Sequence, residues 1–142
     1  MTAMKILYAA VALPALLLLA ACAEKGENVY RTWVGPDRPN MAIVTLRLGD
    51  EVRDVTIRER VLPRSDYGTI LLVPGQYTLH EQDNASIAIT IPPVLINTEQ
   101  ARARGELILG HTYILRAGKS DSGNRALWVE DARSGDIFID TR

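Results

Sequence analysis

The amino-acid sequence predicts an all-β protein, an antiparallel β-sandwich preceded by a cleaved signal peptide. Beyond residue 40, apolar residues recur with a period of two, which is typical of strands with one buried face. Glycine and polar turn residues interrupt these runs roughly every 8–12 residues, as in sandwiches and barrels. At 142 residues, the chain has the length of one domain.

The N-terminal segment has the pattern of a secretory signal. Lys5 provides a positive start, and an uncharged run from Ile6 to Ala21 follows. This run is shorter than the ~20 residues that a helix needs to cross a bilayer, and it ends in two small residues. We therefore expect residues 1–21 to be removed.

The end of this segment, Leu19-Ala20-Ala21-Cys22, resembles the lipobox of bacterial lipoproteins. The resemblance implies that the thiol of Cys22 carries a diacylglycerol and that its new amino group is acylated. Ala23 stands where lipoproteins retained in the inner membrane usually carry Asp. The resemblance thus implies a lipid-anchored protein on the periplasmic face of the outer membrane.

Residues 22–35 are interpreted as the lipidated cysteine and a short tether, and residues 36–142 as the sandwich domain. Cys22 is the only cysteine, so an internal disulfide and a thiolate zinc cluster are both excluded. Without Lys5, the chain has 15 Lys and Arg against 17 Asp and Glu, with the signs interspersed. This balance argues against nucleic acid as a partner, because nucleic acid requires a basic surface.

The strands are expected in a regular succession. The clearest patterns are Val44, Leu46 and Leu48 before the turn at Gly49-Asp50, and the alternating isoleucines of 87–91. The glycine-containing segments 121–124 and 134–136 are predicted to be hairpin turns. In chain order, the predicted strands are 41–48, 55–61, 69–73, 76–81, 87–91, 106–109, 112–116, 126–130 and 136–140.

One segment, 97–104, has a helical pattern. Asn97 or Thr98 can cap its N-terminus and Gly105 can end it. At eight residues, this helix depends on packing against the domain for its stability.

Two resemblances refine the predicted fold. Residues 71–79, Leu-Leu-Val-Pro-Gly-Gln-Tyr-Thr-Leu, resemble the Pro-Gly hairpin of transthyretin-like and carboxypeptidase-regulatory-like sandwich domains. Pro74 and Gly75 are predicted to form the two corners of a type II turn. A longer resemblance, to a group of small proteobacterial lipoproteins without an assigned activity, rests on Gly35-Pro36, the Pro-Gly hairpin, residues 110–115 and residues 128–135.

No catalytic, metal or cofactor site is predicted. His80 and His111, the only histidines, are interpreted as surface turn residues, whereas a zinc or copper site usually needs more imidazoles or thiolates. None of the serines lies in a Gly-x-Ser-x-Gly motif. The acidic residues between 130 and 140 are interpreted as a solvated hairpin with loose ion pairs.

Three aromatic residues are the candidates for an interaction surface. Trp128 lies between two aliphatic residues, so it and its neighbours must face opposite sides of their strand. Tyr30 and Trp33 either cover Trp128 and close the sandwich, or form with it an exposed patch for a protein partner. The first arrangement is the expected one.

Two function classes remain open. The first is a non-enzymatic binding or accessory module of the cell envelope, with a protein or a glycan as partner. The alternative is a hydrolase or a metal-dependent envelope enzyme without a recognisable motif. A deep polar pocket in which His80, His111 or acidic side chains converge is expected only of the enzyme.

Overall fold

The computed structural model describes residues 26–82 and 85–142, and the predicted signal peptide and Cys22 lie outside these ranges. The described residues form a two-sheet β structure, which confirms the all-β prediction. No helix among them is long and apolar enough to cross a bilayer. The elements are β1 (Asn28–Arg31), η1 (Asn40–Ala42), β2 (Val44–Leu48), β3 (Val55–Ile57), β4 (Arg60–Leu62), β5 (Tyr67–Leu72), β6 (Gly75–Glu81), β7 (Ser86–Ile91), α2 (Thr98–Arg104), β8 (Thr112–Lys119), β9 (Arg125–Asp131) and β10 (Ile137–Asp140).

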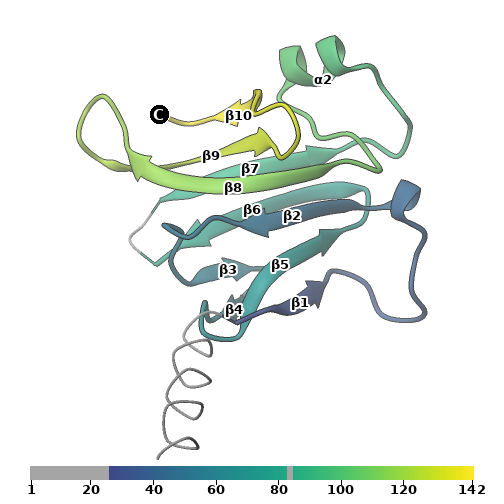
Figure 1. Cartoon of the computed structure of the whole chain (residues 1–142), viewed down its shortest axis with the longest axis horizontal. Coiled ribbons are helices and arrows are strands. Elements are labelled where there is room, and N and C mark those ends of the chain that lie inside the picture. Colours follow the sequence, from purple (N-terminus) through teal and green to yellow (C-terminus); the bar gives the residue numbers. More distant parts are fainter. Residues whose placement is uncertain (1–25, 83–84) are drawn as a thin grey trace, which may run out of the picture.

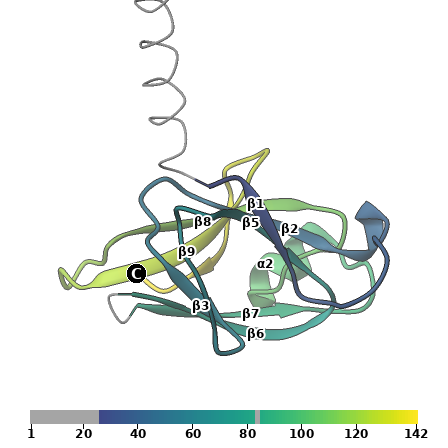
Figure 2. The same ribbon diagram turned by 90° about the horizontal axis from the view of Figure 1, so that it is seen from below.

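The two sheets face each other as layers (Figures 1 and 2). Sheet A has the strand order β1-β5-β2-β8-β9-β10, and sheet B has the order β4-β3-β6-β7. Sheet A is mixed, because β1 pairs with β5 and β2 pairs with β8 in parallel. The prediction of a wholly antiparallel sandwich is wrong at these two pairs. The chain passes through sheet B between β2 and β5 and again between β5 and β8, so β5 can lie beside β1, and β8 beside β2, with the same direction.

The core lies between the layers and follows the predicted alternation. Val44, Leu46 and Leu48 of β2 are buried, while Arg47 between them is exposed. Ile87, Ile89 and Ile91 of β7 supply the facing side. Burying such aliphatic side chains contributes about 1.5–3 kcal/mol each before the entropy of ordering them is counted.

The segment 71–79 is a corner between the sheets, so the predicted hairpin is wrong. β5 pairs within sheet A, whereas β6 pairs with β3 and β7 in sheet B. Gly75 has φ +151°, far from the roughly +80° of a type II turn. The Tyr77 hydroxyl donates a hydrogen bond to the Val73 carbonyl at 2.6 Å, which fastens the corner.

Two predicted strands are also revised. The segment 55–61 is a hairpin of β3 and β4, whose turn residues Arg58 and Glu59 have φ of 49° and 66°. The turn changes the direction of the chain, so Val61 is exposed and Leu62 is buried. Residues 106–109 form no strand beyond one bridge between Thr90 and Glu106, although the apolar part of this segment is buried.

The predicted closure of the sandwich by Tyr30 and Trp33 over Trp128 is wrong. β1 belongs to sheet A, so the sandwich includes residues that the sequence assigned to the tether. β1 and β9 are four strand spacings apart, roughly 19 Å at about 4.8 Å each. Tyr30 instead packs edge-on against Tyr67, and the Trp33 ring lies 4.6 Å from the Arg31 guanidinium.

Candidate functional site

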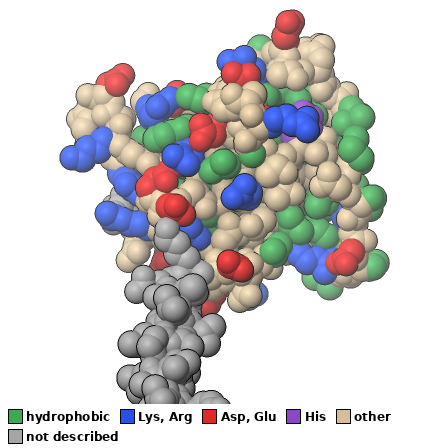
Figure 3. All heavy atoms as spheres, in the orientation of Figure 1, with side chains coloured by type: hydrophobic (Ala, Val, Ile, Leu, Met, Phe, Trp, Pro, Cys, Tyr) green, Lys and Arg blue, Asp and Glu red, His purple; other side chains and the backbone are tan. Residues whose placement is uncertain are grey.

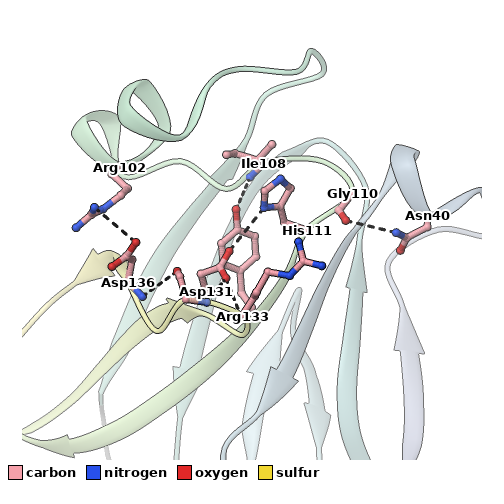
Figure 4. Close-up of polar contacts among 10 residues, drawn as sticks. Asn40, Arg102, Ile108, Gly110, His111, Asp131, Arg133 and Asp136 are labelled. Atoms are coloured by element: carbon pink, nitrogen blue, oxygen red, sulfur yellow. Dashed lines mark hydrogen bonds and ion pairs between the residues drawn. The ribbon is translucent and has the colours of Figure 1, made fainter.

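A surface groove of about 510 Å³ lies where β8 begins and β9 ends, beside α2. We call it the His111 groove. Figure 3 shows a His side chain beside basic side chains at the upper right of the molecule, and Figure 4 shows the groove in detail. Its lining residues are Thr98, Gly110, His111, Thr112, Asp131, Ala132, Arg133, Ser134, Asp136 and Phe138.

The pairing of β8 with β9 builds the centre of the groove. Tyr113 lies opposite Asp131 in the antiparallel register, so His111, two residues earlier, comes next to the Asp131 carboxylate. The His111 Nδ1 atom lies 3.6 Å from Asp131 Oδ2. This is an ion-pair contact when the imidazole is protonated, and it is longer than a hydrogen bond.

The loop after β9 directs backbone N–H groups at Asp131. Its Oδ1 atom accepts hydrogen bonds from the N–H groups of Arg133 and Ser134, at 2.8 and 2.9 Å. Burial by itself raises the pKa of the Asp131 carboxyl, but these two hydrogen bonds and the nearby imidazole outweigh it and lower the pKa. Asp131 is therefore a carboxylate at neutral pH, with both oxygens already engaged.

Two aromatic rings support the groove from below. Tyr113 is fully buried and stacks under His111, with ring centroids 6.2 Å apart and an interplanar angle of 20°. Its hydroxyl accepts a hydrogen bond from the Ile108 N–H at 2.9 Å, and burial raises the pKa of Tyr113 to about 12. Phe138 packs edge-on against Tyr113 and gives the groove an apolar floor.

The helix α2 forms the far wall of the groove, and its predicted ends are confirmed. The Asn97 side chain accepts a hydrogen bond from the Gln100 N–H, and Gly105 takes the left-handed conformation at the C-terminus. From the last turn, Arg102 Nη1 lies 3.8 Å from Asp136 Oδ2. Both side chains are 48% exposed, so this pair contributes little stability and leaves Asp136 open to a ligand.

Arg133 is the free cation of the groove. It is exposed, and none of the residues described forms an ion pair with its guanidinium. Its side chain extends toward His111 and Gly110 (Figure 4). Arg133 and His111 thus bring N–H groups to the same side of the groove.

The groove does not hold a serine–histidine–aspartate triad. The Ser134 hydroxyl accepts a hydrogen bond from the Asp136 N–H, and the Ser134 backbone binds the Asp131 carboxylate. Within residues 26–82 and 85–142, no hydroxyl is hydrogen-bonded to the His111 imidazole. The geometry provides an oriented imidazole and no nucleophile positioned to use it.

The two histidines are not brought together. His80 is exposed on β6 of sheet B, opposite Thr56 and Ser86, whereas His111 precedes β8 of sheet A. Among the residues that the structure describes, no three His, Cys, Asp or Glu side chains could hold a metal ion together. The acidic residues of 130–140 do lie on a hairpin with several ion pairs, as the sequence predicted.

The predicted aromatic residues lie outside the groove. Tyr30 and Trp33 are near β1, and Trp128 points away from the core, under the Arg142 guanidinium at 4.3 Å. Sequence reasoning named His111 and the acidic residues of 130–140 but did not join them into a site. The feature that reveals the site is the proximity of the Gly110-His111 turn to the 131–136 turn. This proximity can be recognised only when the register of β8 and β9 is known.

Comparisons with protein-family models, curated proteins and solved structures give no match to this chain. The fold and the site define its class: a two-sheet, all-β domain with an open polar groove at one end of sheet A.

Proposed function

We propose that this protein is a lipid-anchored binding module of the cell envelope, which engages a protein partner through the His111 groove without catalysing a reaction. The observation that carries the proposal is the unpaired Arg133 guanidinium beside the His111 imidazole in a groove of about 510 Å³. That volume is in the usual range of ligand-binding pockets.

The anchor rests on the sequence alone. The lipobox-like Leu19–Cys22 segment follows an uncharged run, and the implied lipid on Cys22 provides more than one acyl chain. Because each buried CH₂ contributes about 0.8 kcal/mol, several chains on one residue hold a protein on a membrane stably. Attachment to the outer membrane, on its periplasmic face, is part of the proposal.

The position of the groove supports a role facing away from the membrane. Five residues separate Cys22 from Asn28 at the start of β1, so the six Cα–Cα steps between them limit the tether to about 20 Å. β1 is one edge of sheet A, and β10, beside the groove, is the other edge. Figure 1 shows β1 at the bottom of the molecule and α2 with β10 at the top. A partner can therefore reach the groove while the N-terminal edge lies near the lipid.

Binding is favoured over the alternative, hydrolysis, because the polar groups that could catalyse a reaction already contact other residues of the protein. Asp131 orients the His111 imidazole, but the Ser134 hydroxyl is held by Asp136. Hydrolysis through a covalent intermediate needs a nucleophile within about 2.6–3.2 Å of its base. The groups that remain available, Arg133 and Asp136, are those that recognise a polar ligand.

The proposal is tested by photocrosslinking in living cells with the full-length, lipidated protein, followed by mass spectrometry. A photoreactive benzoylphenylalanine replaces Thr98 on the rim of the groove. The matched control replaces Lys119, which is exposed at the far end of β8. A Cys22→Ala variant checks the anchor by membrane fractionation.

We expect one dominant protein crosslinked from position 98 and not from position 119, and release of the Cys22→Ala variant from the membrane. Equal crosslinking from both positions, or no partner above background, contradicts the binding proposal. Membrane retention of the Cys22→Ala variant contradicts the anchor.

A further inference from the structure

We propose that the ligand group recognised by the His111 groove is the free carboxylate of a peptide, held by Arg133 and His111. This inference rests on the proposed function, because it names the chemistry that the partner presents to the groove.

The groove has unused hydrogen-bond donors and few unused acceptors on its His111 side. Asp131 already accepts from two backbone N–H groups and faces the His111 Nδ1 atom. Its charge is therefore balanced within the protein. The Arg133 guanidinium has five N–H donors and, among the residues described, no carboxylate partner. The second ring nitrogen of His111, Nε2, is a further donor when the imidazole is protonated. These donors select an anion.

The charge of the groove favours a monoanion over a dianion. Arg102 and Arg133 are balanced by Asp131 and Asp136, so the groove is neutral when His111 is neutral and carries one positive charge when it is protonated. A phosphate with two negative charges would face two carboxylates at close range. A carboxylate carries one charge, and its planar pair of oxygens matches the paired N–H groups of a guanidinium.

The rest of the groove fits a peptide chain. Phe138 and Ala132 provide apolar surface for side chains, while Thr98 and the half-exposed Asp136 carboxylate can accept hydrogen bonds from peptide N–H groups. Arg133 and the half-exposed Asp136 lie on opposite sides of Asp131 (Figure 4). A peptide with its terminal carboxylate at Arg133 and its chain running toward Asp136 and α2 would bind both the Arg133 guanidinium and the Asp136 carboxylate.

The test uses the mature lipidated protein in phospholipid nanodiscs and a matched pair of probes. The first probe is acetyl-trialanine with a free carboxylate, and the second is the same peptide with a C-terminal amide. Binding is measured by isothermal titration and by saturation-transfer NMR. The variant is Arg133→Gln, and the matched control is Arg104→Gln, which removes an exposed arginine of α2 that does not line the groove.

We expect the acid to bind at least about tenfold more tightly than the amide, a difference that corresponds to one lost ionic contact of about 1.4 kcal/mol. The Arg133→Gln variant loses this preference and Arg104→Gln keeps it. Equal binding of acid and amide, or a preference that persists in Arg133→Gln, overturns the inference. Competition by inorganic phosphate that is as strong as the acid peptide also overturns it, since the site would then be a general anion site.

The failure of this inference can be told apart from failure of the proposed function. If the crosslink from position 98 persists in Arg133→Gln while neither peptide binds, the groove engages its partner through other chemistry, and only the carboxylate inference is lost. If no partner is crosslinked from position 98 in any variant, the proposed function is lost regardless of peptide binding.

Discussion

Replacing Arg125 with Met is expected to destabilise the protein strongly, because Arg125 neutralises a buried carboxylate. Glu81, at the end of β6 in sheet B, has a side chain with 0% exposure. It accepts hydrogen bonds from Arg125 Nε at 2.8 Å, from Arg125 Nη2 at 3.0 Å and from the Arg53 N–H at 2.8 Å. Arg125 starts β9 in sheet A and also donates to the Glu51 carbonyl. The pair therefore ties the two sheets together.

The size of the loss in unfolding free energy follows from the Glu81 carboxylate, which the substitution leaves buried without its partner. Breaking one side of a buried ion pair typically costs about 3–5 kcal/mol, since the remaining charge is uncompensated. The Arg125 side chain is 23% exposed, so water can reach part of the vacated space, and we expect the lower end of about 3 kcal/mol. In a domain of this size, such a loss lowers the Tm by roughly 10 °C or more.

The stability that Arg125→Met loses is expected to depend on pH. Burial alone raises the pKa of the Glu81 carboxyl, but hydrogen bonds from Arg125 and from the Arg53 backbone outweigh it, so the pKa lies below its usual value. The native pair therefore stabilises the protein above the unfolded pKa of about 4.3, and this stabilisation is lost as the pH falls through the folded pKa. In Arg125→Met, the carboxyl can protonate more easily, so the difference in unfolding free energy between variant and native protein narrows below about pH 4.5.

The assay is urea unfolding followed by tryptophan fluorescence between pH 3.5 and 8. The matched control is Arg116→Met on β8, whose ion pairs with Glu51 and Glu130 are partly exposed and are expected to contribute less than about 1 kcal/mol. A double variant, Glu81→Leu with Arg125→Met, should recover most of the stability, because apolar replacements of buried pairs are often neutral. The reasoning is refuted if Arg125→Met unfolds like Arg116→Met, or if the double variant is no more stable than Arg125→Met alone.

Three further predictions concern single residues. Tyr113→Phe leaves the buried Ile108 N–H without an acceptor and should cost about 1–3 kcal/mol, seen as a fall in Tm; an unchanged Tm would contradict the role of this hydroxyl. Gly26→Ala would place a Cβ atom in steric conflict with the Asp66 backbone, so the Gly26 amide should lose its protection from hydrogen exchange; retained protection would count against this close approach. Trp33→Ala removes a ring packed on arginines and should cost no more than about 1 kcal/mol by urea unfolding, whereas a loss above about 3 kcal/mol would restore a closing role for Trp33.

Local patterns in the sequence predicted many of the strands and the ends of the helix. The period-two alternation placed β2, β6, β7, β8 and β9 and gave the buried faces of β2 and β7, because alternate side chains of a strand necessarily point to opposite sides. The ends of α2 were also predicted from the sequence, since Asn97 and Gly105 cap the helix through interactions with backbone groups only a few residues away.

Some turns were misread because the same local residues serve different connections. Pro74-Gly75 suits a hairpin as well as a corner, and only the partners of β5 and β6 distinguish the two. The alternation of 55–61 continued in phase across a turn, which hid the β3–β4 hairpin. The apolar residues of 106–109 are buried as irregular chain, since burial requires apolar side chains and not a particular backbone.

The sequence by itself determined which side chains of β2 and β7 are buried and where α2 begins and ends, and it predicted the lipobox-like leader, because each of these depends on residues adjacent in the chain. Only the tertiary structure decided which strands are neighbours, that β1 and β9 are far apart, and that His111, Asp131 and Arg133 share a groove. Alternation reports which side chains face inward but not which backbone pairs with which. Pairing is selected by hydrogen bonds and packing among residues distant in sequence, so a site made across two strands appears only when the register is known.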